Sequence, residues 1–287
     1  MHIITHRGLE PSKKSYFSES SYEAFKDQLA RGYGIEFDPN FIKDNRITIA
    51  HDATLSRITK GKDMRSFSEL TPEEITGISL GNGRLCFFEE LMELIRKSES
   101  KINAMHVKGG YQQEPFITIL IDHIKKYAND LVERFMIFDL KPEVAREMKK
   151  RIPDLHLAPS VADVYDIERY NGAVKGTLIS LEDAIQMGPS GEKLYDWVWL
   201  DEWDRRAKDG SDKTFYNEKT FTALKNAGYK ISLVTPELHG TSPGLLGGEA
   251  HEDAANTEKL MTRIKEIIDL KPDAICTDYP EEASQLC

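Results

Sequence analysis

Short segments rich in β-branched and aromatic residues alternate with longer helical patterns along most of the chain. Eight of these segments predict strands, at residues 3–5, 34–37, 102–107, 134–140, 155–158, 197–200, 230–235 and 274–277. Apolar residues recur at helical spacing between them, at residues 22–29, 87–97, 114–127, 142–150, 161–170, 217–226 and 257–270. Helical crossovers connect parallel strands, so the alternation predicts an α/β fold, a closed (β/α)₈ TIM barrel in which residues 1–287 form a single domain.

Several stretches interrupt or border this alternation. Residues 39–84 predict an insertion after the second strand, with a hairpin that turns at Asp44 and Asn45. Residues 172–195 have room for an additional strand at 176–179, so the count of eight is an interpretation. Ser20 and Glu23 have the spacing of a capping box before the first helix. Residues 243–248 are rich in glycine but lack the GK[ST] ending of a phosphate loop, and they predict a flexible loop at the barrel mouth.

Charge and composition exclude several classes of protein. The 48 acidic residues outnumber the 38 basic residues, and a formal charge of −10 disfavours binding to nucleic acids and stable association with anionic membranes. No apolar run approaches the roughly 20 residues that span a bilayer. Three scattered cysteines and an N-terminus without a signal-peptide pattern favour a cytoplasmic protein that acts on a small molecule. The oligomeric state is left open.

Polar residues gather where the predicted strands end, which is where barrel enzymes carry their reactive groups. The residues in such positions are His6, Arg7, Glu36, Asp38, His51, His106 and Lys108. Glu36 and Asp38 are two residues apart on one strand, so their carboxylates face the same side and suit a hard cation. Two histidines can supply a base and an acid near neutral pH, and the basic residues suit a phosphate. The set predicts phosphoryl chemistry.

Each of these residues also has a structural interpretation. The two carboxylates can form a solvated strand end, and His51 can be a hydrogen-bonded core histidine. Arg7 and Lys108 can simply pair with acids at the barrel mouth. Three roles are equally favoured for His106: a metal ligand, a substrate contact and an inert replacement. Asp52 either orients His51 or caps the next turn. Packing is favoured over a substrate platform for the three tryptophans, Trp197, Trp199 and Trp203.

The order and spacing of these residues resemble the glycerophosphodiester phosphodiesterase family. The motifs that carry the resemblance are His6-Arg7-Gly8, Glu19 at the start of a helix, Gly34-Ile35-Glu36-Phe37-Asp38, and His51-Asp52-x-x-Leu55-x-Arg57-x-Thr59-x-Gly61. Residues 272–280 resemble the last strand of that family. The likeness is dense over residues 3–80 and sparse through the middle of the chain.

The resemblance implies an enzyme that binds one divalent cation, Mg²⁺, Ca²⁺ or Mn²⁺, and hydrolyses a glycerophosphodiester to a phosphomonoester and an alcohol. It implies that His6 and His51 are the acid–base pair, without saying which is the acid. The metal ligands that it implies are Glu36, Asp38 and the residue at position 106, and the implied phosphate contacts are Arg7 and Lys108. In this family the first nucleophile can be a neighbouring hydroxyl of the substrate, which gives a cyclic phosphate that water then opens.

The chain departs from the family pattern at three places. His106 stands where the family usually has a glutamate, and a neutral imidazole shifts the expected preference toward Mn²⁺, Co²⁺ or Zn²⁺. Residues 17–21 and the seventh strand also lack usual family residues, so the substrate can differ from an ordinary glycerophosphodiester. Two alternatives stay open: a lyase similar to sphingomyelinase D that stops at a cyclic phosphate, and a non-catalytic barrel that binds a phospho-ligand.

Overall fold

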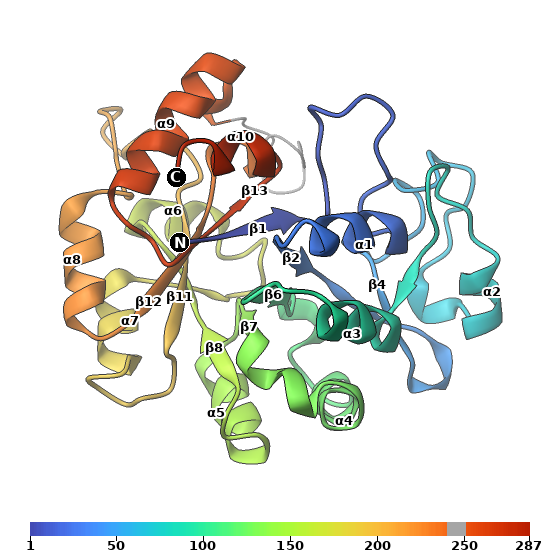
Figure 1. Ribbon diagram of the computed structural model, residues 1–287. Coiled ribbons are helices and arrows are strands. Elements are labelled where there is room, and N and C mark those ends of the chain that lie inside the picture. The colour runs from blue at the N-terminus through green and yellow to red at the C-terminus, as the bar shows by residue number, and fades with distance from the viewer. Residues whose placement is uncertain (240–250) are drawn as a thin grey trace.

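A curled sheet of parallel strands forms the centre of the protein, and helices cover its outside (Figure 1). The computed structural model describes residues 1–239 and 251–287. The predicted loop at residues 243–248 lies outside the described residues. Within the described ranges, no helix combines the length and the apolar character needed to cross a membrane.

All strands of the central sheet run parallel. In chain order they are β1 (His2–His6), β2 (Gly34–Phe37), β6 (Asn103–His106), β7 (Phe135–Phe138), β8 (His156–Ala158), β9 (Ser160–Ala162), β10 (Leu178–Ile179), β11 (Trp197–Asp201), β12 (Lys230–Val234) and β13 (Ala274–Thr277). Their order in the sheet is β10-β9-β11-β12-β13-β1-β2-β6-β7-β8.

The sheet closes into a barrel where β8 runs into β9. β8 pairs with β7, and β9, which follows after Pro159, pairs with β11. The backbone N–H of Trp199 donates to the carbonyl oxygen of Pro159 at 3.0 Å, so the pairing continues across the break. With β8 and β9 counted as one bent strand, the described residues form eight barrel strands, and β10 is the additional strand expected at residues 176–179. The predicted (β/α)₈ TIM barrel is confirmed.

Helices follow the strands and surround the barrel (Figure 1). They are α1 (Tyr22–Ala30), α2 (Pro72–Thr76), α3 (Phe88–Lys97), α4 (Phe116–Tyr127), α5 (Pro142–Arg151), α6 (Val164–Tyr170), α7 (Leu181–Met187), α8 (Glu218–Asn226), α9 (Thr257–Asp269) and α10 (Pro280–Ser284). Short 3₁₀ turns are η1 (Lys43–Asn45), η2 (Phe67–Glu69), η3 (Gly109–Tyr111), η4 (Asn129–Arg134), η5 (Pro236–His239) and η6 (Glu252–Ala254).

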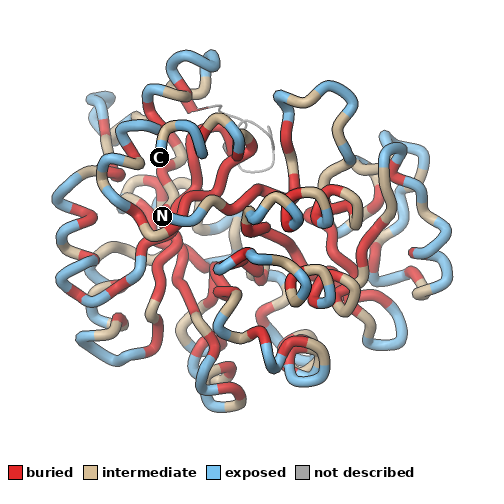
Figure 2. The backbone as a smooth tube through the Cα atoms, in the orientation of Figure 1, coloured by how far each residue is buried: buried red, intermediate tan, exposed pale blue. Residues whose placement is uncertain are grey.

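Apolar spacing decides which face of each helix turns toward the sheet. The buried residues of α3 are Phe88, Leu91, Met92 and Ile95, which lie three or four positions apart on one face. Figure 2 shows the same division along the chain, with buried backbone inside and exposed backbone on the outer turns of the helices. Burying each large apolar side chain contributes roughly 1.5–3 kcal/mol, so these faces hold the helices against the barrel.

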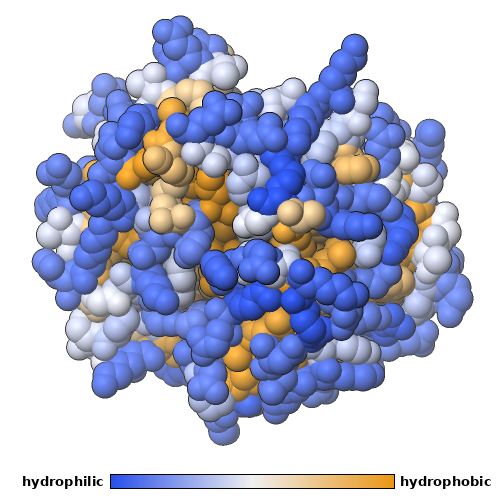
Figure 3. All heavy atoms as spheres, in the orientation of Figure 1, coloured by the Kyte–Doolittle hydropathy of each residue, from blue (hydrophilic) through white to orange (hydrophobic). Residues whose placement is uncertain are grey.

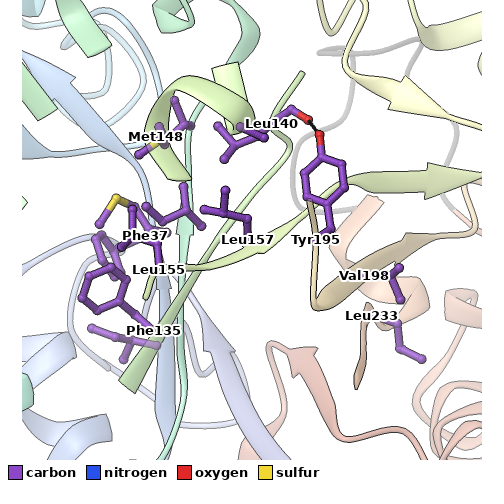
Figure 4. Packing of buried hydrophobic residues seen from close by; sticks show 14 of the residues in the cluster. Phe37, Phe135, Leu140, Met148, Leu155, Leu157, Tyr195, Val198 and Leu233 are labelled. Atoms are coloured by element: carbon purple, nitrogen blue, oxygen red, sulfur yellow. Dashed lines mark hydrogen bonds between the residues drawn. The ribbon is translucent and has the colours of Figure 1, made fainter. Parts of the chain in front are cut away.

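The core between the sheet and the helices contains a polar anchor as well as apolar contacts. Phe135, Leu155 and Leu157 pack from the barrel strands and the turn before β8 (Figure 4). The hydroxyl of Tyr195 donates to the backbone carbonyl of Leu140 at 2.7 Å. Because a buried hydroxyl without a partner is costly, this bond fixes the segment before β11 against the loop after β7.

The segment predicted as an insertion, residues 39–84, joins residues 86–87 in a small sheet of its own beside α1 and α3 (Figure 1). Antiparallel strands β3 (Pro39–Phe41) and β4 (Ile47–Ile49) pair with each other, and β5 (Cys86–Phe87) pairs with β4. Asp44 and Asn45 turn the predicted hairpin with positive φ angles of 59° and 54°. A separate apolar cluster, with Leu55, Phe67 and Leu70 at its centre, supports the insertion.

Three local predictions were wrong. Ser20 has φ 54°, outside the extended region that an N-cap residue adopts, so Ser21 caps α1 and accepts from the N–H of Ala24 at 3.1 Å. Glu23 therefore does not complete a capping box; its carboxylate accepts from the backbone of Arg84. The helix predicted from residue 161 begins only at Val164, because residues 160–162 are needed as β9. The stretch 172–195 also contains α7, which was not predicted.

Hydrophilic side chains cover most of the face seen in Figure 3, and apolar residues show only in the gaps between elements.

Candidate functional site

The carboxyl ends of the barrel strands and the insertion surround a cavity of about 810 Å³. Cavities of this size commonly bind small molecules. The sequence-predicted residues that line it are His6, Arg7, Glu36, His51, His106 and Lys108. The seventh, Asp38, is buried next to them, with a carboxylate oxygen 3.3 Å from Nζ of Lys108. The fold therefore brings all seven residues together.

Strand register explains this convergence. Phe37 on β2 pairs with Met105 on β6, which sets Asp38 beside His106 at the strand ends. His51 comes from the insertion, and the backbone N–H of Ala50 donates to the carbonyl of Asp38 at 3.0 Å. The insertion thus carries one histidine to the barrel mouth, while the barrel carries the others.

Glu36 and Asp38 form a buried carboxylate pair. The side-chain atoms Oε2 of Glu36 and Oδ2 of Asp38 are buried and have no hydrogen-bond partner among the described residues. Burial and the charge of Asp38 raise the pKa of Glu36 to about 8. Burial also disfavours the charged form of Asp38, but Lys108 and the neighbouring imidazoles outweigh it and hold that pKa well below its ordinary value. At neutral pH the pair thus holds essentially one negative charge, which Asp38 carries.

The imidazole of His106 lies between two acids. Its Nδ1 is 2.9 Å from Oδ1 of Asp38, and its Nε2 is 3.3 Å from Oδ2 of Asp139. Burial lowers the pKa of His106, but the hydrogen bonds to Asp139 and Asp38 outweigh burial and raise it to about 9. Glu36, Asp38 and His106 each offer a ligand atom, and these atoms lie within 4.8 Å of one another. Such a group of oxygen and nitrogen atoms can hold a divalent cation.

The side chain of His51 is held by its sequence neighbour. Its Nδ1 is 2.7 Å from Oδ1 of Asp52, and the Nε–H of Arg57 donates to the other oxygen of Asp52 at 2.6 Å. A hydrogen bond at Nδ1 leaves Nε2 for the cavity that His51 lines. Burial lowers the pKa of His51 to about 4, so the imidazole is neutral near pH 7.

The side chain of His6 is held in the same manner by a residue far away in the sequence. Its Nδ1 is 3.0 Å from Oδ1 of Asp278, which follows β13. The backbone N–H of Asp278 donates to Oε1 of Glu237 at 3.0 Å, so the acid is fixed in turn. Burial, with the nearby charge of Arg7, holds the pKa of His6 well below its ordinary value. Two imidazoles, each with an acid at Nδ1, therefore face one cavity.

Two cations stand beside the carboxylates. The guanidinium of Arg7 donates to Glu19 at 3.2 Å, and Glu19 also accepts from Arg57. The ammonium of Lys108 donates to the backbone carbonyl of His51. These contacts hold both cations at the cavity wall, where their charge suits a phosphate.

Two acids that contact the site histidines were not predicted from the sequence, and a third was one of two alternatives. Asp139 was placed inside a strand expected to run to residue 140, but β7 ends at Phe138 and Asp139 turns into the cavity wall with φ 66°. Asp278 lies within residues 272–280, which the sequence matched to the family's last strand only as a segment, and its pairing with His6 spans 272 positions. Asp52 was left undecided between two roles, and its contact is with His51.

Aromatic residues form part of the cavity wall. Phe138 stacks on Trp199 with ring centres 3.9 Å apart, and Tyr170 stacks on Trp203 at 4.7 Å. All four rings line the cavity. Trp199 and Trp203 thus combine packing with contact to the cavity, whereas the ring of Trp197 belongs to the core inside the barrel.

The fold and the cavity at its carboxyl end define a (β/α)₈ barrel of the kind that carries ligand sites on its strand ends. The chain belongs to the glycerophosphoryl diester phosphodiesterase family, whose model matches residues 6–165, more than half of the 287 residues. A curated glycerophosphodiester phosphodiesterase from Caldanaerobacter subterraneus subsp. tengcongensis is 32% identical over 165 residues. That match covers 54% of this chain and 64% of the relative, so it spans less than two thirds of the curated protein.

Solved structures support the fold over the whole chain. A phosphodiesterase from Oleispira antarctica, in complex with the product sn-glycerol-3-phosphate, superposes with a TM-score of 0.64 at 16% identity and covers 100% of this chain and 96% of that one. A glycerophosphodiester phosphodiesterase from Thermotoga maritima gives a TM-score of 0.60 at 17% identity, with 99% and 97% covered. At these identities the similarity concerns the fold.

Proposed function

We propose that this chain is a divalent-metal-dependent phosphodiesterase that hydrolyses a glycerophosphodiester-like substrate to a phosphomonoester and an alcohol. One observation carries the proposal: two neutral imidazoles, each held at Nδ1 by an acid, line the cavity that contains the carboxylate pair. A binding protein has no need of a matched acid and base. Membership of the phosphodiesterase family supports the same conclusion.

Glu36, Asp38 and His106 would hold the cation. The buried oxygens without hydrogen-bond partners among the described residues fit this role, because such atoms are costly unless a ligand or cation satisfies them. When bound, the cation supplies positive charge that polarises the phosphoryl oxygens. The imidazole among the ligands favours Mn²⁺ or a softer ion over Ca²⁺.

The remaining residues would bind the phosphate and move protons. Arg7 and Lys108 would hold the non-bridging oxygens of the diester. One histidine, through Nε2, would take the proton of the attacking hydroxyl as its oxygen bonds to phosphorus. The other, after taking up a proton from solvent on Nε2, would give that proton to the alcohol oxygen as the bond between this oxygen and phosphorus breaks. His6 and His51 are both suited to either role, so their assignment stays open.

Two alternative functions differ in their products. A lyase would stop at a cyclic phosphate formed by the substrate's own hydroxyl, and a phospho-ligand-binding barrel would release nothing. The hydrolase is favoured because the chain belongs to the glycerophosphoryl diester phosphodiesterase family. A small-molecule diester free in the cytoplasm, rather than nucleic acid or a membrane surface, is the proposed substrate because of the charge of −10.

The experiment that tests the proposal is turnover of a diester panel that includes glycerophosphocholine and bis(p-nitrophenyl) phosphate. Each reaction contains Mg²⁺, Ca²⁺, Mn²⁺, Co²⁺, Zn²⁺ or EDTA, and ³¹P NMR separates phosphomonoester from cyclic phosphate. The variants are His6→Ala and His51→Ala. His2→Ala is the matched control, because His2 stands at the opposite, exposed end of the same strand as His6.

The proposal predicts metal-dependent phosphomonoester formation that both site variants lose and the control retains. A stable cyclic product would establish the lyase instead. Undiminished turnover in EDTA, or in His6→Ala and His51→Ala, would refute the proposed chemistry.

A further inference from the structure

His106 stands at a position where the family usually has a glutamate, and a nearby acid can compensate for the missing carboxylate. Exchanging a carboxylate ligand for imidazole removes one negative charge from the metal cluster. An imidazole that binds a metal through one nitrogen commonly donates its other N–H to a carboxylate, which fixes the tautomer and makes the ring a stronger ligand. Asp139 offers such a carboxylate, 3.3 Å from Nε2 of His106.

Building on the proposed function, we infer that Asp139 is a positioning residue that holds His106 as the Nε2–H tautomer and aims its Nδ1 at the cation held by Glu36 and Asp38. The Nδ1 atom already faces that cluster, at 2.9 Å from Asp38. The ligand set loses one negative charge by having His106. The carboxylate of Asp139 supplies that charge again, next to the ligand rather than at the metal.

Stacking fixes the plane of the ring. The imidazole of His106 stacks on Phe138 with centres 4.7 Å apart and an interplanar angle of 12°, and Phe138 stacks in turn on Trp199. A stacked ring can still flip by 180° about its Cβ–Cγ bond, which keeps the stacking plane but puts carbon atoms where the two nitrogens stood. The carboxylate of Asp139 on one side and the metal cluster on the other select between those two orientations.

The loop around Asp139 is built to hold the carboxylate in place. Asp139 is 5% exposed and adopts φ 66°, a backbone conformation that an aspartate keeps only where its surroundings enforce it. The amide of Gln112 donates to the backbone carbonyls of Asp139 at 2.6 Å and of Val107 at 2.7 Å, and its oxygen accepts from the N–H of Lys141 at 2.8 Å. One buried side chain therefore ties the loop after β6 to the loop after β7.

Metal binding by the full-length protein tests this inference, with Mn²⁺ as the probe. Calorimetry gives the affinity, and pulsed EPR detects a directly bound imidazole through its ¹⁴N coupling. The variants are Asp139→Asn, which keeps shape and removes charge, and His106→Glu, which restores a carboxylate ligand. Asp130→Asn on η4 is the matched control, because Asp130 is exposed and pairs with Arg96 far from the cavity. Circular dichroism and melting curves confirm that each variant is folded.

We expect Asp139→Asn to weaken Mn²⁺ binding about 10- to 100-fold and to change the ¹⁴N coupling. Losing a group that hydrogen-bonds to a metal-bound histidine typically has an effect of this size on affinity. In the His106→Glu background the same change should matter less than about threefold, because no imidazole needs orienting. The control should bind like the parent protein.

Unchanged affinity and coupling in Asp139→Asn would overturn the inference. So would an equal loss in both backgrounds, which would mark Asp139 as a support of the loop alone. Either result leaves the proposed function standing if diester turnover still requires the metal. A parent protein that binds no Mn²⁺ would overturn the inference, and it would overturn the proposed function as well only if no other metal supported diester turnover.

Discussion

Replacing Asp52 with asparagine should inactivate His51 by reversing its tautomer. One oxygen of Asp52 accepts from Nδ1–H of His51, and the other accepts from Nε–H of Arg57. An asparagine has a single oxygen, and Arg57 has no acceptor to offer to an amide. The amide oxygen will therefore face Arg57, and the NH₂ group will face His51. The ring can satisfy that donor only by carrying its proton on Nε2, which removes the lone pair that faces the cavity.

The expected loss of kcat follows from the two N–H donors, one on His51 and one on the asparagine, that would face each other in the active tautomer. Keeping the active tautomer would leave Nδ1–H and the amide N–H facing each other, and each unsatisfied buried donor costs about 1–3 kcal/mol. Because His51 is 7% exposed but Asp52 is more accessible, we take a total of about 2–5 kcal/mol. Each 1.36 kcal/mol is tenfold in rate, so kcat should fall by about 30- to 5,000-fold.

Steady-state kinetics on a diester that the parent protein hydrolyses will measure this. KM should change little, because Asp52 contacts the histidine and not the phosphate. Asp52→Ala should lose less than Asp52→Asn, since alanine imposes no tautomer. Asp52→Asn combined with Arg57→Ala should recover part of the rate, because the amide is then free to turn. An Asp52→Asn variant with the activity of the parent, or no recovery on removing Arg57, would refute the tautomer argument.

Three further predictions concern stability and substrate. The hydrogen bond to Asp196 raises the pKa of half-buried His156, so the pair contributes its full stability below pH 6.5 and loses it as pH rises through the raised pKa. In urea unfolding, the free energy of unfolding of the parent should exceed that of His156→Gln by up to about 1 kcal/mol at pH 5.5, and the difference should close by pH 9. An equal difference at both pH values would contradict this. In melting curves, Mn²⁺ at 100 times its Kd should stabilise the folded parent protein by about 2.7 kcal/mol and should leave the stability of Glu36→Gln unchanged. The same stabilisation in Glu36→Gln would place the cation elsewhere. Trp203→Ala should raise KM roughly two- to twelvefold for diesters with a bulky alcohol and little for small ones, because its ring, stacked on Tyr170, lines the cavity; equal effects on both would exclude a substrate contact.

Strand-end chemistry was readable from the sequence because parallel strands in a closed barrel direct their carboxyl ends to the same mouth. Glu36 and Asp38 needed only period-2 spacing and the end of an apolar run to be assigned to one face. His51 was harder, since it belongs to no barrel strand. Its position depends on the insertion, whose small sheet hydrogen-bonds through Ala50 to the carbonyl of Asp38.

The sequence by itself determined the barrel, the insertion and the seven residues at its mouth, because hydrophobic periodicity and motif spacing are local properties of the chain. Only the tertiary structure decided which acids hold the histidines. Asp278 meets His6 across 272 positions because β1 and β13 are neighbours in the closed sheet. Asp139 meets His106 because β7 ends two residues earlier than its apolar pattern suggests. Such partners depend on strand register and on one backbone angle, and neither is written in the pattern of residue types.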